Sequence, residues 1–268
     1  MTRLLIIGAS GQYETKRIIT AARQSGIEAA AASFRDIVIE GHGDRVLVKG
    51  KDLKFFNVLY FRGFWPYVSE ALIIADAMRR HGGRVVDTSL AERPYIMSKT
   101  FETRALKRAG MSVPRTIQCF ETKRFEAALK SFQFPLIVKG VHGGLGEHVY
   151  LAKNPRQVRE IVKHNRRGFY SLQEYIPARG DIRVITLGYR ALGAMRRRVP
   201  AGGFRANLAQ GGRPEKIELT PQIKKTAERA ARALGREFGG VDIILKNRRP
   251  YVLEVNQTPG FKGFEKVT

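Results

Sequence analysis

Three side chains near the end of the sequence, Asp242, Glu254 and Asn256, have the types and spacing of a metal site. Residues two apart on a strand share a face, so Glu254 and Asn256 point the same way. The connection 246–250 separates two apolar runs, and a hairpin centred on Arg248 places Asp242 opposite Glu254. Two facing carboxylates repel each other in a sheet, which favours a cation between them.

The chemistry of these three side chains suggests which cation. Carboxylate and amide oxygens without histidine or cysteine suit a hard ion, and Mg²⁺ is the natural one. The alternative is that arginine side chains neutralise the two acids, in which case no metal is needed.

The segment 139–146, KGVHGGLG, combines a lysine with glycines in a pattern that favours phosphate binding. Gly143, Gly144 and Gly146 would let backbone N–H groups approach phosphate oxygens closely. Lys139 ends an apolar run and would supply a point charge to the same phosphates. No Gly-Lys-Ser/Thr follows, so the segment is not a Walker loop. The alternative is an ordinary hairpin loop.

Two further segments carry polar residues of the kind that contact nucleotides. In the stretch 173–183 a short strand, QEYI, leads into the loop GDIR, where backbone groups could bind an adenine edge and an acid could hold a ribose hydroxyl. The glycine-rich stretch 202–212 contains Arg205 and Asn207, and arginine binds phosphate and carboxylate bidentately. The alternatives are an edge strand with a solvated turn for the first segment and a basic loop for the second.

Two architectures must position these residues. Residues 1–93 alternate strand and helix, which predicts a βαβ arrangement with a mostly parallel sheet. The turn GASG after the first strand lacks the spacing of a dinucleotide fingerprint. Residues 94–268 are typical of an α+β fold with antiparallel sheets. Strands are expected at 3–8, 46–48, 58–61, 84–87, 136–140, 147–152, 182–187, 191–197, 241–245 and 251–256, and helices at 14–25, 68–81, 99–109, 125–131, 155–165 and 221–238.

Composition bounds the class of protein. The chain has 268 residues, 43% of them hydrophobic, which is enough for two or three packed subdomains. Its formal charge of +24, mostly from residues 94–268, attracts polyanions such as nucleotides, RNA or an acidic protein. The alternative is that the excess reflects a generally basic proteome or proximity to the ribosome. Cys119 is the only cysteine, which excludes an internal disulfide and a cysteine zinc site. Apolar runs too short for a bilayer, and a first run typical of a β-strand, lead us to expect a cytoplasmic protein.

These elements, taken in order, resemble the ATP-grasp superfamily and, within it, the RimK-type α-L-glutamate ligases. The resemblance rests on VKGVHGGLGEHVYLA, QEYI…GDIRVITLG, FRANLAQGG, GGVDIIL and EVNQTPGFKGFEK, and is strongest from Lys99 onward. It implies an ATP-grasp fold, α/β and α+β, with an N-terminal βαβ pre-ATP-grasp domain at 1–93. The ATP-grasp domain would cover 94–268, with a central lid subdomain at about 94–174 and a C-terminal catalytic subdomain at about 175–268.

The resemblance also assigns roles to individual residues. By its analogy Arg183 meets the acyl phosphate. The oxyanion of the second step needs a cationic donor, for which Arg183 or Arg205 is the candidate. The metal set Asp242, Glu254 and Asn256 would hold two Mg²⁺ ions, or sometimes Mn²⁺. The residues implied in ATP binding are Lys99, Lys139, Gly143, Gly144, Gly146, Glu174, Tyr175, Asp181, Arg205, Ala206 and Asn207.

The implied activity is an ATP-dependent ligation of a carboxylate to an amine through an acyl phosphate. L-glutamate would be added to the C-terminus of an acidic protein or peptide, for instance a ribosomal protein. Two alternatives stay open: a ligase of amino-acid biosynthesis acting on an acidic carrier protein, and a non-catalytic basic RNA-binding protein on this scaffold. The resemblance further implies a homo-oligomer, and nothing in the sequence implies a membrane.

Overall fold

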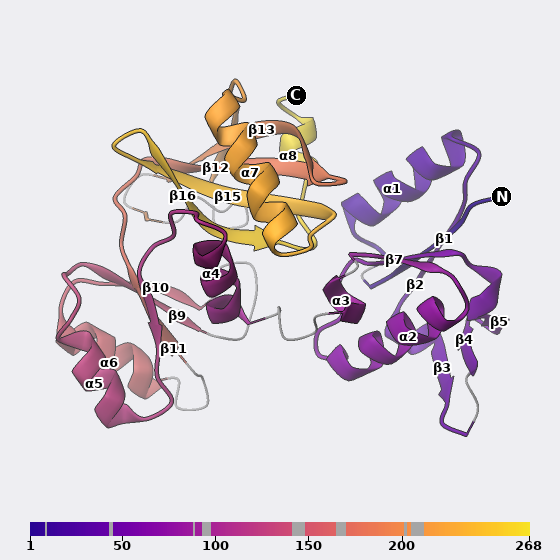
Figure 1. Cartoon of the computed structure of the whole chain (residues 1–268), viewed down its shortest axis with the longest axis horizontal. Coiled ribbons are helices and arrows are strands. Elements are labelled where there is room, and N and C mark those ends of the chain that lie inside the picture. Colours follow the sequence, from indigo (N-terminus) through magenta and orange to yellow (C-terminus); the bar gives the residue numbers. More distant parts are fainter. Residues whose placement is uncertain are drawn as a thin grey trace.

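The computed structural model describes residues 1–8, 10–42, 45–87, 89–92, 98–140, 148–164, 170–200, 203–204 and 212–268. Figure 1 shows the amino-terminal third of the chain as one body and the remainder as a second body built around two sheets. Within the described residues, no helix is both long and apolar enough to cross a membrane.

The amino-terminal body is the expected parallel βαβ sheet. Its strand order is β2-β1-β6-β7, and every neighbouring pair is parallel. Helices α1 and α2 connect these strands, and the buried side chains of Ile74 and Met78 on α2 join Leu5 and Leu59 in one core. The bounds are β1 (Arg3–Ile7), α1 (Tyr13–Gln24), β2 (Glu28–Ala32), β6 (Val58–Phe61), α2 (Val68–Arg80), β7 (Arg84–Val86) and α3 (Ser89–Glu92).

Two details of this body differ from the sequence expectation. The strand expected at 46–48 exists, but it lies in a separate antiparallel sheet of β3 (Ile37–Glu40), β4 (Arg45–Val48) and β5 (Lys51–Asp52), flanked by 3-10 turns at Phe34–Asp36 and Leu53–Phe55. Strand β2, EAAAA, was not expected, because alanine is a poor strand former. Pairing with β1 and the burial of Ala29 and Ala32 override that propensity.

The second body begins with a four-stranded antiparallel sheet that carries Lys139. Its order is β10-β9-β11-β8, from β8 (Thr116–Gln118), β9 (Leu136–Gly140), β10 (Val149–Ala152) and β11 (Tyr170–Glu174). Helices α5 (Thr122–Leu129) and α6 (Pro155–His164) supply apolar side chains, Phe125 and Val158 among them, to a core with Leu136 and Leu172. The antiparallel pair β9 and β10 therefore flanks the segment 141–147, as the sequence predicts.

A five-stranded antiparallel sheet, called sheet D here, carries the candidate metal residues. Its order is β14-β13-β12-β15-β16, from β12 (Gly180–Leu187), β13 (Arg190–Arg198), β14 (Arg213–Lys216), β15 (Phe238–Lys246) and β16 (Arg249–Asn256). Helices α4 (Lys99–Arg108) and α7 (Pro221–Ala233) pack against one face, where Leu106 and Ile223 meet Val241, Ile243, Val252 and Val255. The side chains on the opposite face of sheet D do not belong to this core, and the candidate metal residues are among them.

Helix α7 is shorter than the expected 221–238. It ends at Ala233, and Gly235 follows with a φ of 62°, a left-handed conformation that glycine adopts without strain. Phe238 already begins β15, so the apolar residues after Gly235 belong to a strand. The chain ends with the short helix α8 (Lys262–Glu265).

The two bodies meet along a seam of polar contacts. Asp87, which follows β7, accepts a hydrogen bond of 3.0 Å from the backbone N–H of Phe238 at the start of β15. Arg84 and Glu237 form an ion pair of 2.6 Å beside it. On α1, Glu14 accepts a hydrogen bond of 3.2 Å from the backbone N–H of Phe261. These contacts connect the parallel sheet to both ends of the β15–β16 unit.

The seam makes the stability of the protein sensitive to pH. Asp87 is fully buried, and burial raises the pKa of its carboxyl to about 7, although the N–H of Phe238 favours the charged form. An aspartate in an unfolded chain has a pKa of about 3.9. Between these values the folded protein holds a proton that the unfolded chain has released, so stability falls as the pH rises.

We predict that Asp87→Asn removes this dependence. Relative to wild type, the variant should gain up to about 1.4 kcal/mol of unfolding free energy for each pH unit between about pH 4 and pH 7. Urea unfolding of both proteins across that range measures the difference. A difference that stays constant with pH would contradict the assignment.

Candidate active site

The β15–β16 hairpin brings Asp242 opposite Glu254, as the sequence predicts, by a different route. The turn contains two residues, Asn247 and Arg248, both with positive φ, instead of being centred on Arg248. That turn alone would put Asp242 opposite Leu253. A β-bulge between Asp242 and Ile243 inserts Leu253 as an extra residue and restores the pairing of Asp242 with Glu254.

The bulge also turns Glu254 and Asn256 away from the core. Val252 and Val255 both pack against the α4–α7 side of sheet D, a spacing of three that a regular strand does not allow. Asn256 then lies between the two acids, with its Nδ2 3.3 Å from Asp242 Oδ2 and 3.2 Å from Glu254 Oε1. The three predicted metal residues therefore form one cluster of side chains.

Two arginines hold Asp242 in this structure. Arg183 donates from Nε and Nη2 to the two carboxylate oxygens, each at 2.7 Å. Arg197 Nη2 lies 2.8 Å from Asp242 Oδ2 and also binds Asp181 through two hydrogen bonds of 2.6 Å. The sequence left open that arginines neutralise the acids, and for Asp242 this is the observed arrangement.

The electrostatics of this network follow from its burial. Burial alone would raise the pKa of Asp242, but the charges of Arg183 and Arg197 outweigh it and hold that pKa well below its ordinary range. Burial and the neighbouring charge of Asp242 raise the pKa of Asp181 to about 6, in spite of Arg197. Asp242 therefore stays ionised and available as an oxygen ligand at neutral pH.

Sequence reasoning missed Arg197, although the sequence contained the signal. A hairpin centred on Tyr189 sets Asp181 opposite Arg197, and this is the observed pair. Here too a two-residue turn, Gly188 and Tyr189, combines with a bulge between Ile185 and Thr186. The same register argument that located Glu254 would have located Arg197.

The two predicted nucleotide lysines lie beside the acid cluster. Lys99 begins α4, and its Nζ is 3.5 Å from the carbonyl oxygen of Gly140 at the end of β9. Burial lowers the pKa of Lys139; the charge of Glu254 opposes this shift and that of Lys99 adds to it. Two cations and two acids from sheet D, α4 and β9 thus share one electrostatic environment.

Glu102 is a further acid near this site that sequence reasoning did not single out. It lies one turn after Lys99 on α4 and pairs with Arg236 at 3.1 Å. Burial raises the pKa of Glu102 to about 7; Arg236 opposes this shift and the charge of Glu254 adds to it. Its spacing of three from Lys99 was the available signal, since the two then share a helix face.

Glu174 ends β11 and links the Lys139 sheet to sheet D. Its Oε1 accepts a hydrogen bond of 2.9 Å from Lys246, beside the β15–β16 turn. Its backbone N–H donates to the carbonyl oxygen of Arg115 at 2.8 Å. Tyr175 follows and is half-buried. The adenine contact proposed for these two residues, and the ribose contact proposed for Asp181, stay predictions.

The remaining predicted site residues lie outside the described part of the chain. They are Gly143, Gly144 and Gly146 of the glycine segment, and Arg205, Ala206 and Asn207. Their roles stay predictions.

Arg197 is the residue whose removal should cost most stability in this network. We predict that Arg197→Met, which leaves two buried carboxylates without their shared partner, destabilises the fold by roughly 3–5 kcal/mol. Arg196→Met removes the same charge from an exposed neighbour on β13 and should change stability by less than about 0.5 kcal/mol. Urea unfolding measures both variants, and equal effects would contradict the role of Arg197.

Comparisons with known proteins agree with this geometry. The model of the RimK-like ATP-grasp domain matches residues 98–268. A "Probable alpha-L-glutamate ligase" from a Picosynechococcus species is 30% identical over 264 residues, which is 96% of this chain and 87% of the relative. "Probable alpha-L-glutamate ligase 2" from Pseudoalteromonas atlantica is also 30% identical, over 96% of this chain and 87% of its own length.

Solved structures show the same fold. A RimK domain ATP-grasp protein from Sphaerobacter thermophilus superposes with a TM-score of 0.76 at 21% identity, covering 99% of this chain and 94% of the other. The ATP-grasp ligase PsnB, solved with Mg and ADP and a phosphomimetic precursor, gives a TM-score of 0.71 at 19% identity, covering 99% and 93%. The predicted ATP-grasp fold is confirmed. This chain belongs to the RimK-like ATP-grasp family and is an ATP-dependent ligase.

Proposed function

We propose that this ligase adds L-glutamate to the C-terminal carboxylate of an acidic protein or peptide. The observation that carries the proposal is the cluster of Asp242, Glu254 and Asn256 beside Lys99 and Lys139. Relatives at about 30% identity, named as probable α-L-glutamate ligases, support glutamate as the amine. The acidic acceptor is supported by the formal charge of +24.

The donor set fits Mg²⁺. Asp242, Glu254 and Asn256 offer only oxygens as ligands, and Asn256 would present its Oδ1 after its amide turns over. Among the described residues, no three His, Cys, Asp or Glu side chains form a metal site on their own, so phosphate oxygens would complete the coordination. Two ions are proposed by analogy with the family. When bound, Mg²⁺ would neutralise the triphosphate and orient it.

The acceptor carboxylate and the triphosphate are both anions and repel each other, and cationic side chains of the protein reduce this repulsion. The acceptor carboxylate attacks the γ-phosphorus of ATP, an oxygen–phosphorus bond forms, and ADP leaves. Lys99 and Lys139 supply positive charge beside this transfer. The amine nitrogen of glutamate then attacks the acyl carbon and gives up a proton to solvent, inorganic phosphate leaves with the bonding electron pair, and an amide remains.

Arg183 takes part both in the observed hydrogen bonds to Asp242 and in the proposed reaction. It now covers both oxygens of Asp242, so a cation reaches those oxygens only after Arg183 moves. Arg197 would keep Asp242 in place through its second partner, Asp181. The released guanidinium of Arg183 would be free to donate to the oxyanion of the second step, the role expected from the family resemblance.

A direct assay tests the activity. We predict that the protein with ATP, Mg²⁺ and glutamate forms ADP when a Glu-ended peptide is present, and that the peptide gains the mass of one or more glutamate residues. Coupled ADP detection and mass spectrometry measure both products. No turnover with any Glu-ended acceptor, together with RNA binding that falls steeply with salt, would favour the RNA-binding alternative. Turnover only with an acidic carrier protein would favour the biosynthetic alternative.

The metal assignment is tested by Glu254→Gln. This change keeps the shape and the acceptor for Asn256 but removes a charged ligand. We predict a loss of turnover of at least about a hundredfold, since a bound metal supplies several kcal/mol. The Mg²⁺ concentration for half-maximal rate should also rise, while the thermal unfolding midpoint stays near that of wild type.

The matched control is Glu218→Gln, the same chemical change at an exposed position of the same body. Its turnover and Mg²⁺ dependence should equal those of wild type. If Glu254→Gln behaves like this control, the metal assignment is wrong.

A further inference from the structure

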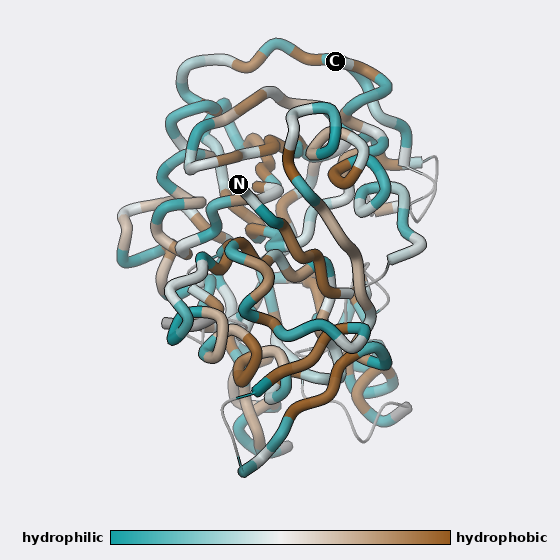
Figure 2. The backbone as a smooth tube through the Cα atoms, turned by 90° about the vertical axis from the view of Figure 1, so that its right-hand side faces the viewer, coloured by the Kyte–Doolittle hydropathy of each residue, from teal (hydrophilic) through white to brown (hydrophobic). Residues whose placement is uncertain are grey.

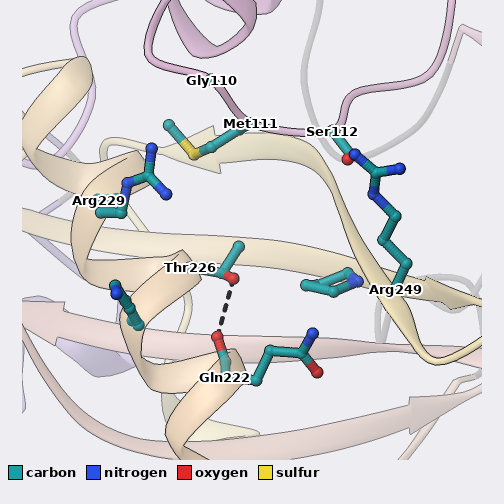
Figure 3. Close-up of a pocket in the computed structure, with 9 residues that line it drawn as sticks. Gly110, Met111, Ser112, Gln222, Thr226, Arg229 and Arg249 are labelled. Atoms are coloured by element: carbon teal, nitrogen blue, oxygen red, sulfur yellow. Dashed lines mark hydrogen bonds between the residues drawn. The ribbon is translucent and has the colours of Figure 1, made fainter.

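A second cationic site lies on the opposite face of sheet D. A cavity of about 300 Å³ opens between α7, the segment after α4 and the start of β16. Figure 3 shows Gln222, Thr226 and Arg229 lining it from α7, with Gly110 to Ser112 and Arg249 on the other sides. Helix α7 packs on the face that bears Val241, so the cavity does not share the face of Asp242.

Among the residues that the structure describes, the cavity concentrates positive charge without a counter-charge. The described lining residues include Lys225, Arg229 and Arg249 and no acid. Lys225 and Arg229 lie one turn apart on α7, a spacing at which like charges repel. The one acid of α7, Glu228, accepts a hydrogen bond of 3.1 Å from the N–H of Ala191 on β13 and does not line the cavity.

The three cations differ in how they are held. Arg229 donates to the carbonyl oxygen of Ala109 at 2.6 Å, which fixes its guanidinium at the rim. The side chains of Lys225 and Arg249 form no hydrogen bond or ion pair with any residue that the structure describes. Gln222, Thr226 and Ser112 add polar groups between them. An anion that enters such a site reduces the repulsion between the three cations.

We propose that this cavity binds side-chain carboxylates of the acidic acceptor, upstream of the end that is modified. The proposal rests on the proposed function. Bidentate contacts of arginine suit carboxylates, and the volume suits one or two such groups. Nucleic acid is disfavoured because none of the described residues that line the cavity is an aromatic that could stack on a base.

The position of the cavity sets a length requirement. Arg249 and Glu254 are five residues apart on β16, which is about 17 Å along the strand. Strand β16 is the last strand of sheet D, and the backbone N–H of Val252 donates to the carbonyl oxygen of Ser112 on its outer side at 2.9 Å, so an extended peptide would pass from one face to the other around an end of the strand. An acceptor whose last residue reaches the Glu254 cluster therefore needs roughly six or more residues to place a carboxylate in the cavity.

Binding without turnover tests the site directly. The probes are fluorescent oligoglutamate peptides of three and ten residues, with the full chain and no ATP, followed by anisotropy. Lys225→Gln and Arg249→Gln should each weaken the ten-residue peptide by roughly fivefold, and the double variant by more than about tenfold. Lys224→Gln, a neighbouring exposed lysine of α7 outside the cavity, is the matched control and should change the affinity less than twofold.

Kinetics provide the second readout. The cavity variants should raise the KM of the ten-residue acceptor, with kcat, the KM of ATP and the KM of the three-residue acceptor unchanged. The proposal would be overturned if Lys224→Gln raised the KM of the ten-residue acceptor as much as Lys225→Gln and Arg249→Gln do. It would also be overturned if the cavity variants raised the KM of the three-residue and ten-residue acceptors equally. A third contrary result would be that binding of a single-stranded RNA oligonucleotide depends on these residues while binding of the peptide does not.

The two proposals fail separately. If wild type shows no glutamate ligation and the cavity variants still weaken peptide binding selectively, the proposed activity fails and the carboxylate site stands. If wild type ligates glutamate and the cavity variants bind like Lys224→Gln, only the carboxylate site fails.

Discussion

The arrangement of sheet D depends on one buried arginine. Arg197, 2% exposed, reaches from β13 to Asp181 on β12 and to Asp242 on β15. Burying a carboxylate costs several kcal/mol unless a partner compensates for it, and here one guanidinium compensates for two carboxylates. Arg197 and Arg183 together keep Asp242 ionised and fixed in place. In the proposed reaction Arg183 would be the exchangeable partner of Asp242, with Arg197 continuing to hold it.

Backbone irregularities make one face of sheet D charged and leave the other face apolar where α4 and α7 pack. Bulges in the β12–β13 and β15–β16 pairs shift the register by one residue and gather Asp181, Arg183, Arg197, Asp242 and Glu254 on one face. The other face carries valines and isoleucines against α4 and α7. In the amino-terminal body, which faces the viewer in Figure 2, hydrophobic strand segments likewise alternate with hydrophilic turns. The separation of the two faces of sheet D allows a buried core and a charged site on the same strands of eight or nine residues.

The sequence predicted much of this, for physical reasons that can be named. Short apolar runs located β6 and β9 to the residue, and the facing of Asp242 and Glu254 followed from hairpin symmetry. The symmetry argument worked because each bulge compensates for a turn one residue shorter than expected. Local pattern did not give β2, whose alanines become a strand only through burial against β1. Nor did it give the contacts of Lys99 or Glu102, since these depend on how α4 docks between two sheets.

We propose that Asp242, Glu254 and Asn256 hold a divalent ion against the phosphates of the nucleotide and that Arg183 moves aside for that ion. A crystal structure with ADP and Mn²⁺, using the anomalous signal of manganese, would locate the ion. We expect a manganese peak at about 2.1 Å from oxygens of the three side chains, with Arg183 moved off Asp242. A manganese peak elsewhere, with Arg183 still bound to both oxygens of Asp242, would contradict it.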